Sequence, residues 1–225
     1  MANPAQLLHD QLISWRGPQT TSASQVRQAA ISDDWLGHRI AVRHLDAIDE
    51  LLNQMTTAGR NVRVYRGQFP NWCAAVFAYP SGWQGQGSAQ MNSTALDHLE
   101  SLADRLIDFV PTVKPGGLEE VREYVESIRQ LLDEDQTITD PNLIMHVKRV
   151  IAHLMWCVDN YDAVGDFDLQ EALERLAAAV VRAGAASGDK ERWRGHMDRW
   201  VWPFGVNAQG VIPATALGQL ALGGG

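Results

Sequence analysis

Apolar residues recur at alternating spacings of three and four in four successive segments of this chain, within 96–110, 118–132, 144–158 and 169–180. Such spacing places each set on one stripe of a helix. A mean step of about 3.5 residues is typical of helices that pack at shallow angles. Short connections rich in Pro, Gly and Asp separate the segments, which makes successive helices antiparallel. The predicted fold class is mainly α, with an up-down-up-down antiparallel four-helix bundle over residues 94–183.

The third of these helices is apolar beyond its stripe, because Leu143, Met155, Trp156 and Cys157 widen its apolar arc. A helix that is apolar over a wide arc is buried on more than one side. The sequence therefore predicts that the N-terminal part or a second subunit covers this helix, and we expect a homo-oligomer.

Residues 1–80 predict a smaller, mostly helical module with at most one or two short strands. A capped amphipathic pattern predicts a long helix over about 33–58, and the alternation in "NVRVYRG" predicts a short strand over about 61–66. Prolines bracket a predicted short helix over about 70–78. The Gly- and Ser-rich stretch 81–93 is typical of a flexible linker.

Residues 188–225 predict a short helix, an aromatic anchor and an uncharged arm. The anchor consists of Trp193, Trp200, Trp202 and Phe204, with Trp156 of the third bundle helix as a further interface candidate. The 26 residues from Trp200 to the end carry no charge, which is long enough to cross a bilayer as a helix. Prolines and many glycines interrupt the stretch, so membrane association is the less favoured interpretation.

The net charge of −8 is concentrated in residues 94–175, where 7 basic and 18 acidic residues give 7 − 18 = −11. Such a surface repels nucleic-acid phosphates and suits a basic protein partner. Two cysteines are too few for a disulfide framework, and the first residues lack the pattern of a signal peptide. These features predict a cytoplasmic protein, and a composition rich in Arg, Ala and Gly is typical of bacterial or phage coding.

No phosphate-binding, nucleophile-elbow or zinc-protease motif occurs, so we expect neither a cofactor nor a catalytic set. His146, His153 and Cys157 lie on similar faces of one predicted helix and are the only metal-ligand candidates, although packing explains them better. A ligand pocket between the two modules would use the cations and rings nearest the junction: Arg39, Arg43, Tyr65 and Trp72.

The sequence therefore favours a non-enzymatic, self-associating helical protein that acts in regulation by binding another protein. Two alternatives stay open at this stage. One is a membrane-acting effector that uses the uncharged tail, and the other is an enzyme or small-ligand sensor with a pocket of unrecognised type.

Overall fold

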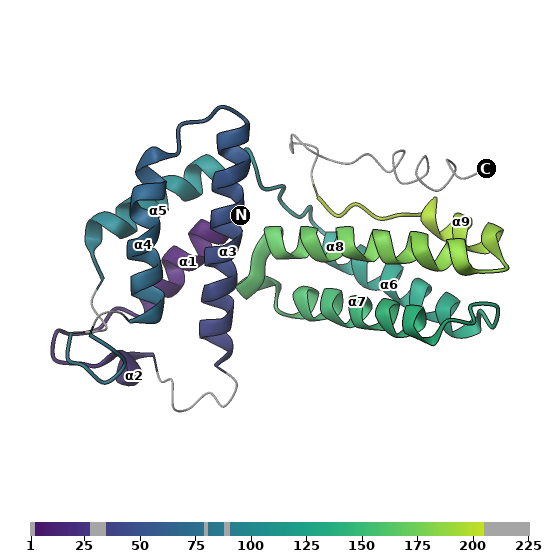
Figure 1. Cartoon of the computed structure of the whole chain (residues 1–225), viewed down its shortest axis with the longest axis horizontal. Helices are drawn as coiled ribbons and strands as arrows, with labels where there is room; N and C mark the ends of the chain where they lie inside the picture. Colours follow the sequence, from purple (N-terminus) through teal and green to yellow (C-terminus); the bar gives the residue numbers. More distant parts are fainter. Residues whose placement is uncertain (1–2, 28–34, 79–80, 88–90, 205–225) are drawn as a thin grey trace. The chain divides into compact units, whose positions relative to one another are not determined.

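The structure, a computed structural model, describes residues 3–27, 35–78, 81–87 and 91–204. Within these residues the regular elements are all helices. They are α1 (Pro4–Ser14), α2 (Ala23–Val26), α3 (Leu36–Thr57), α4 (Arg63–Phe77), α5 (Ser93–Leu106), α6 (Gly117–Glu134), α7 (Pro141–Asp159), α8 (Tyr161–Ala186) and α9 (Lys190–Met197) (Figure 1). The mainly α class predicted from the apolar periodicity is confirmed.

The chain divides into two compact units. The first consists of Met1–Val110 with Asp162–Gly165, and the second of Pro111–Tyr161 with Asp166–Gly225. Each unit has its own buried apolar residues and is described below by itself.

In the first unit, α1 packs against α3 and α5, and α4 packs against the same two helices. The core contains the fully buried side chains of Leu8, Leu12, Ile48, Leu52 and Leu99. The Asn3 side chain caps α1 by accepting from the Gln6 amide, and its Nδ2 donates to the Ala103 carbonyl at 2.9 Å. One side chain thus starts α1 and ties it to α5.

The long helix expected near 33–58 corresponds to α3, but the elements around it differ from the predictions. The strand predicted over about 61–66 is wrong, since α4 begins at Arg63 and continues through Pro70. Val62, Tyr65, Trp72 and Val76 are buried, which is a helical spacing that outweighs the short Val62–Val64 alternation. Pro70 is exposed, so its ring does not disturb the core.

Part of the stretch predicted as a linker contacts α2. Residues 81–87 lie along α2, where the Ser24 amide donates to the Trp83 carbonyl at 3.0 Å and Ser22 forms an isolated bridge with Gln86. Residues 93 onward already belong to α5. The polar composition of the stretch is therefore that of a surface loop held by backbone hydrogen bonds.

The second unit is built from α6, α7 and the main part of α8, with α9 packed on α6 (Figure 1). Two ion pairs fix α6 and α7 as antiparallel: Arg122 with Asp159 at 2.7 Å, and Lys148 with Asp133 at 2.8 Å. Arg122 near the start of α6 pairs with the last residue of α7, whereas Asp133 near the end of α6 pairs with Lys148 in the first half of α7.

The four-helix arrangement predicted for 94–183 is not confirmed. The first of its helices, α5, buries Leu96, Leu99 and Leu106 within the first unit, against α1 and α4. From Pro111 onward, the connection after α5 belongs to the second unit, where the Val113 amide donates to Asp166 Oδ1 at 3.0 Å. An apolar stripe requires a partner but does not specify which helix provides it.

Candidate functional site

The four residues predicted to line a ligand pocket all lie in the first unit. Trp72 is fully buried, and its Nε1 donates to the Ala95 carbonyl at 2.7 Å. Tyr65 is 5% exposed, with its hydroxyl 3.3 Å from Ser101 Oγ. Both rings therefore pack α4 against α5, which leaves them closed to a ligand. Arg39 is exposed on α3, and Arg43 is half-buried on the same helix.

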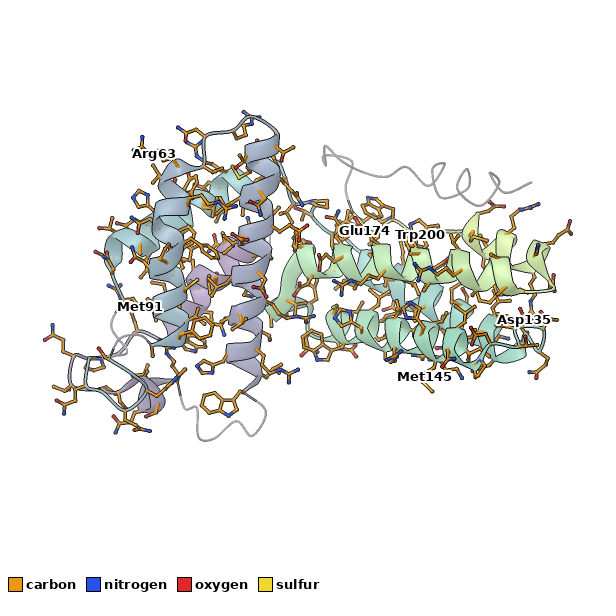
Figure 2. The ribbon with its side chains drawn as sticks, in the orientation of Figure 1. Arg63, Met91, Asp135, Met145, Glu174 and Trp200 are labelled. Carbon is orange, nitrogen blue, oxygen red and sulfur yellow. The ribbon has the colours of Figure 1, made fainter. Side chains whose placement is uncertain are left out.

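The predicted aromatic anchor is a packed part of the second unit. Trp193 is fully buried, Trp200 meets the Tyr124 ring edge-on with centroids 5.2 Å apart, and Trp202 lies 5.0 Å from Phe204. Figure 2 labels Trp200 in this unit. The anchor thus covers α6, whereas the sequence favoured the flank of the following helix or the N-terminal module.

Phe204 is 4% exposed and forms an isolated backbone bridge with Val113. The uncharged arm after it, residues 205–225, lies outside the described residues. Within the described residues, no helix combines the length and the apolarity needed to cross a membrane.

The helix α7 carries the remaining interface and metal candidates. Trp156 is half-buried, with the His153 ring stacked 6.3 Å away, and Cys157 is fully buried. His146 is half-buried on the same helix. Over the part of the chain that the structure describes, no three His, Cys, Asp or Glu side chains are grouped so that they could hold a metal ion.

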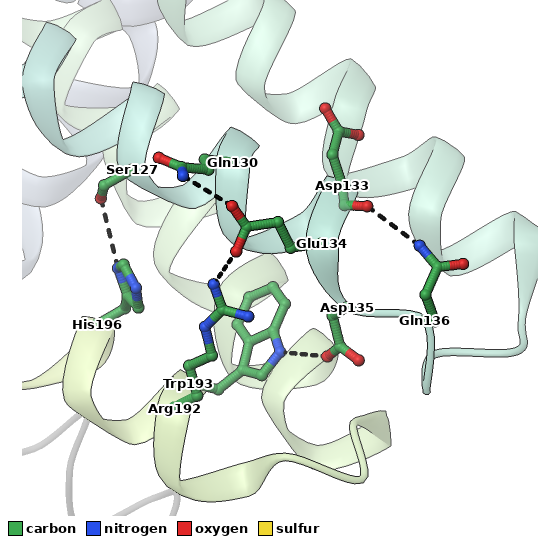
Figure 3. A network of polar contacts seen from close by, with 9 residues as sticks. All are labelled: Ser127, Gln130, Asp133, Glu134, Asp135, Gln136, Arg192, Trp193 and His196. Carbon is green, nitrogen blue, oxygen red and sulfur yellow. Dashed lines mark hydrogen bonds and ion pairs between the residues drawn. The ribbon is translucent and has the colours of Figure 1, made fainter.

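A polar network surrounds Asp135, at the turn that follows α6 (Figure 3). Its carboxylate accepts from Trp193 Nε1 at 2.7 Å and from Ser187 Oγ at 2.6 Å. It also accepts from the amide and the hydroxyl of Thr137, at 2.9 and 2.5 Å. One side chain thus joins the end of α6, the end of α8 and the start of α9.

Burial acts to raise the pKa of Asp135, but hydrogen bonds from Ser187, Thr137 and Trp193 outweigh it and hold that pKa well below its ordinary value. The carboxylate is therefore ionised at neutral pH. Fixed donors occupy the lone pairs of this carboxylate. This arrangement is typical of a structural role and not of a proton-transfer group.

Exposed and half-buried contacts continue this network along α6 and α9. Glu134 pairs with Arg192 and accepts from Gln130 at 2.7 Å, and Ser127 Oγ lies 3.4 Å from His196 Nδ1 (Figure 3). The Glu134–Arg192 pair is exposed, and pairs of this kind contribute little stability. We conclude that the Asp135 network holds α9 in place.

A second arrangement, which we call the tryptophan cluster, lies in the first unit and consists of Trp15, Arg27, Trp35, His38 and Trp83. The His38 ring is surrounded: it stacks on Trp15 with centroids 4.5 Å apart and meets Trp83 and Trp35 edge-on, at 4.7 and 5.2 Å. Trp35 also meets Trp83 edge-on at 5.6 Å. Segments far apart in the sequence therefore contribute to one aromatic surface.

Arg27 lies among these rings, with its guanidinium carbon 4.5 Å from the Trp15 ring centre and 5.1 Å from that of Trp83. Its two terminal nitrogens donate to the carbonyls of Val76 and Ala75, at 2.8 and 2.7 Å. Burial lowers the pKa of Arg27 to about 10, so the group stays charged at neutral pH. Burial, and then the Arg27 charge, lower the pKa of His38, which leaves its ring neutral there.

Three buried polar atoms at this cluster have no hydrogen-bond partner within the described structure: Arg27 Nε, His38 Nε2 and Gln11 Oε1. Gln11 adjoins the cluster because its Nε2 donates to the Gly37 carbonyl at 2.6 Å. Buried polar atoms are normally satisfied, and those left over often mark a site where water or a ligand binds.

Trp35 is the exposed member of the cluster. Its side chain is 44% exposed, and its backbone adopts a left-handed conformation with φ of 54° immediately before α3. A bulky residue in that region is strained, and such residues gather at ligand clamps. Sequence reasoning missed this cluster because its members lie on separate segments. The high tryptophan content was the one signal of it.

Comparison of the chain with protein-family models, curated proteins and solved structures finds no match. A functional assignment therefore rests on the residues described above.

Proposed function

We propose that this chain is a non-enzymatic interaction protein that binds a segment of another protein through the tryptophan cluster. Tryptophan and arginine are the residues on which binding energy most often concentrates at protein interfaces. The observation that carries the proposal is Trp35, a large ring that is 44% exposed although rings on two sides contact it.

The chemistry of the cluster favours an extended segment that contains proline or aromatic residues. Aromatic walls accommodate such side chains, and an extended backbone supplies both amide donors and carbonyl acceptors. Gln11 Oε1 accepts, Arg27 Nε donates, and His38 Nε2 does either according to its tautomer. Displacement of the Trp35 ring would open these atoms to the segment.

The charge of the chain favours a basic partner. Residues 94–175 carry a net charge of −11, from 7 basic and 18 acidic residues, and opposite charges accelerate association at low ionic strength. We therefore propose a basic partner protein that carries the proline- or aromatic-containing segment. An increase in salt should slow its association more than its dissociation.

The test is a selection of random peptides on the purified chain, followed by affinity measurements on variants. Peptides that bind should be enriched in proline and aromatic residues. Trp35→Ala should weaken their binding by at least about ten-fold, in line with a hot-spot residue. Trp156→Ala is the matched control, because this tryptophan is half-buried on α7 in the other unit, and it should leave affinity unchanged.

Two outcomes would count against the proposal. If no peptide is enriched over an unrelated helical protein, the cluster is a packing feature of the first unit. If Trp156→Ala abolishes binding and Trp35→Ala does not, the interface lies on α7 instead. Self-association, which we also propose, is measured separately by light scattering across a range of concentrations.

A further inference from the structure

A pocket of about 340 Å³ lies in the first unit, where the turn after α3 meets the end of α5. Its lining residues include two arginines, an aspartate and an amide, together with a methionine and a phenylalanine: Met55, Gly59, Arg60, Asn61, Arg105, Asp108 and Phe109. Binding sites for small molecules begin at about 300 Å³, so the pocket has the size of one.

The backbone that shapes this pocket is fixed. Gly59 adopts a left-handed conformation with φ of 73°, which ends α3 and lets the Arg60 amide donate to the Met55 carbonyl at 2.8 Å. Asn61 Oδ1 then accepts from the Arg63 amide at 3.1 Å and starts α4. Figure 2 labels Arg63 at this end of α4. The Arg60 side chain therefore leaves from a defined turn.

Neither arginine of the pocket forms an ion pair with a described residue, although Asp108 is also in the lining. The Arg105 guanidinium carbon lies 5.9 Å from the centre of the Tyr65 ring, which restricts its orientation without neutralising it. Two guanidinium groups thus remain available to an external anion, and their fork geometry matches carboxylate and phosphate oxygens.

The lining of the pocket also contains two apolar side chains, Met55 and Phe109. Met55 is 2% exposed and Phe109 is half-buried. A ligand that fits this lining has an anionic group and a flat apolar part. The anionic group would contact the arginines, and the apolar part would contact Met55 and Phe109. An inorganic anion would contact the arginines but not the apolar side chains of the pocket.

We propose that this pocket binds a small organic anion, whose carboxylate or phosphate group contacts Arg60 and Arg105 and whose apolar part contacts Met55 and Phe109. The site is independent of the tryptophan cluster. Trp35 precedes the first residue of α3, whereas the pocket lies at its other end, and a helix of 22 residues spans about 33 Å. The proposal for one site can therefore be wrong while the proposal for the other is right.

The experiment titrates the full chain with phenyl phosphate, benzoate and benzyl alcohol while the arginine Nε–Hε signals are followed by NMR. Phenyl phosphate or benzoate should shift two arginine signals and saturate with a Kd of roughly 1 mM or tighter. Benzyl alcohol, which has the ring without the charge, should bind at least about ten-fold more weakly. The comparison of phenyl phosphate with benzoate identifies the preferred anionic group.

Three variants assign the site. Arg60→Gln and Arg105→Gln should each weaken binding by about ten-fold or more, whereas Arg16→Gln, an exposed arginine elsewhere in the unit, should change it less than about two-fold. Asp108→Asn should tighten binding by about two- to five-fold, because it removes a negative charge from the lining. A general loss of structure cannot produce that opposite sign.

The proposal is overturned if neither anion shows saturable binding up to about 10 mM, a concentration well above the affinity expected. Equal binding of benzyl alcohol, or an equal effect of Arg16→Gln, would also overturn it. Far-UV circular dichroism of each variant verifies that the helices are intact.

Discussion

The indole Nε1 of Trp193 donates to Oδ2 of Asp135 at 2.7 Å, across 58 residues of sequence. The indole is fully buried and the carboxylate residue is 9% exposed, so this bond lies inside the second unit. It connects α9 to the turn after α6, and the stability of the unit should depend on it.

Removal of the Trp193 ring should destabilise the chain strongly. Trp193→Ala deletes a fully buried indole and leaves a cavity, which should cost about 3–5 kcal/mol of unfolding free energy. Trp193→Phe keeps most of the packing but removes the donor, and should cost about 1–3 kcal/mol. Urea unfolding measures both. If Trp193→Phe unfolds like the unmodified chain, the hydrogen bond contributes nothing.

Asp135→Asn tests the carboxylate directly. An amide places a donor where Ser187, Thr137 and Trp193 already donate, so we expect a loss of about 2–4 kcal/mol. Because the folded pKa of Asp135 lies below its ordinary value, the carboxylate stabilises the fold above about pH 4, and this contribution disappears as the pH falls further. The variant should therefore lose part of the steepness of acid unfolding.

His44 should make the stability of the fold depend on pH in a range above the one in which Asp135 acts. It is 2% exposed, its Nε2 lies 3.0 Å from the Ala163 carbonyl, and burial lowers its pKa to about 4 from 6.5. A depressed folded pKa means that the stabilisation is complete above pH 6.5 and declines as the pH falls toward 4, by up to about 3 kcal/mol. In His44→Gln this decline should be absent. Chemical unfolding at a series of pH values measures it, and an identical profile in the variant would contradict the assignment.

Arg27 should not be replaceable by lysine. Its two terminal nitrogens reach two neighbouring carbonyls of the last turn of α4, and its flat group lies against Trp15 and Trp83. Lysine carries the charge but cannot reproduce this fork, so Arg27→Lys should cost about 1–3 kcal/mol. The exposed Arg16→Lys is the control and should be neutral within about 0.5 kcal/mol. Equal stability of the two variants would show that charge alone matters.

Two glycines within helices should respond oppositely to alanine. Gly165 of α8 has φ of 76° and ψ of −167°, a conformation that side chains disfavour, so Gly165→Ala should destabilise by about 1–3 kcal/mol. Gly67 of α4 has helical backbone and open space where a Cβ would lie, so Gly67→Ala should stabilise by about 0.5–1 kcal/mol. Thermal unfolding compares them, and a shift of the same sign in both would refute the backbone argument.

The sequence by itself determined the helical class and most of the long helices. The stripes of α5, α6, α7 and α8 were readable because a helix buries the same face at every turn. Asp followed by Pro is typical of a helix start, and at the start of α7 the Asp140 side chain accepts from the Asn142 amide, with Pro141 as the first helical residue. Local chemistry specifies such features, and they need no knowledge of the partners.

Only the tertiary structure decided which stripe meets which. In that structure α5 belongs to the first unit, and the segment near Val64, where a strand was expected, is the start of α4. The buried Trp193 donates a hydrogen bond to Asp135. The tryptophan cluster and the pocket lined by Arg60 and Arg105 also consist of residues from separate segments. The physical reason is that apolar burial is non-directional: the pattern of one segment fixes that a face is covered, whereas the chain's connections and shapes select the covering element.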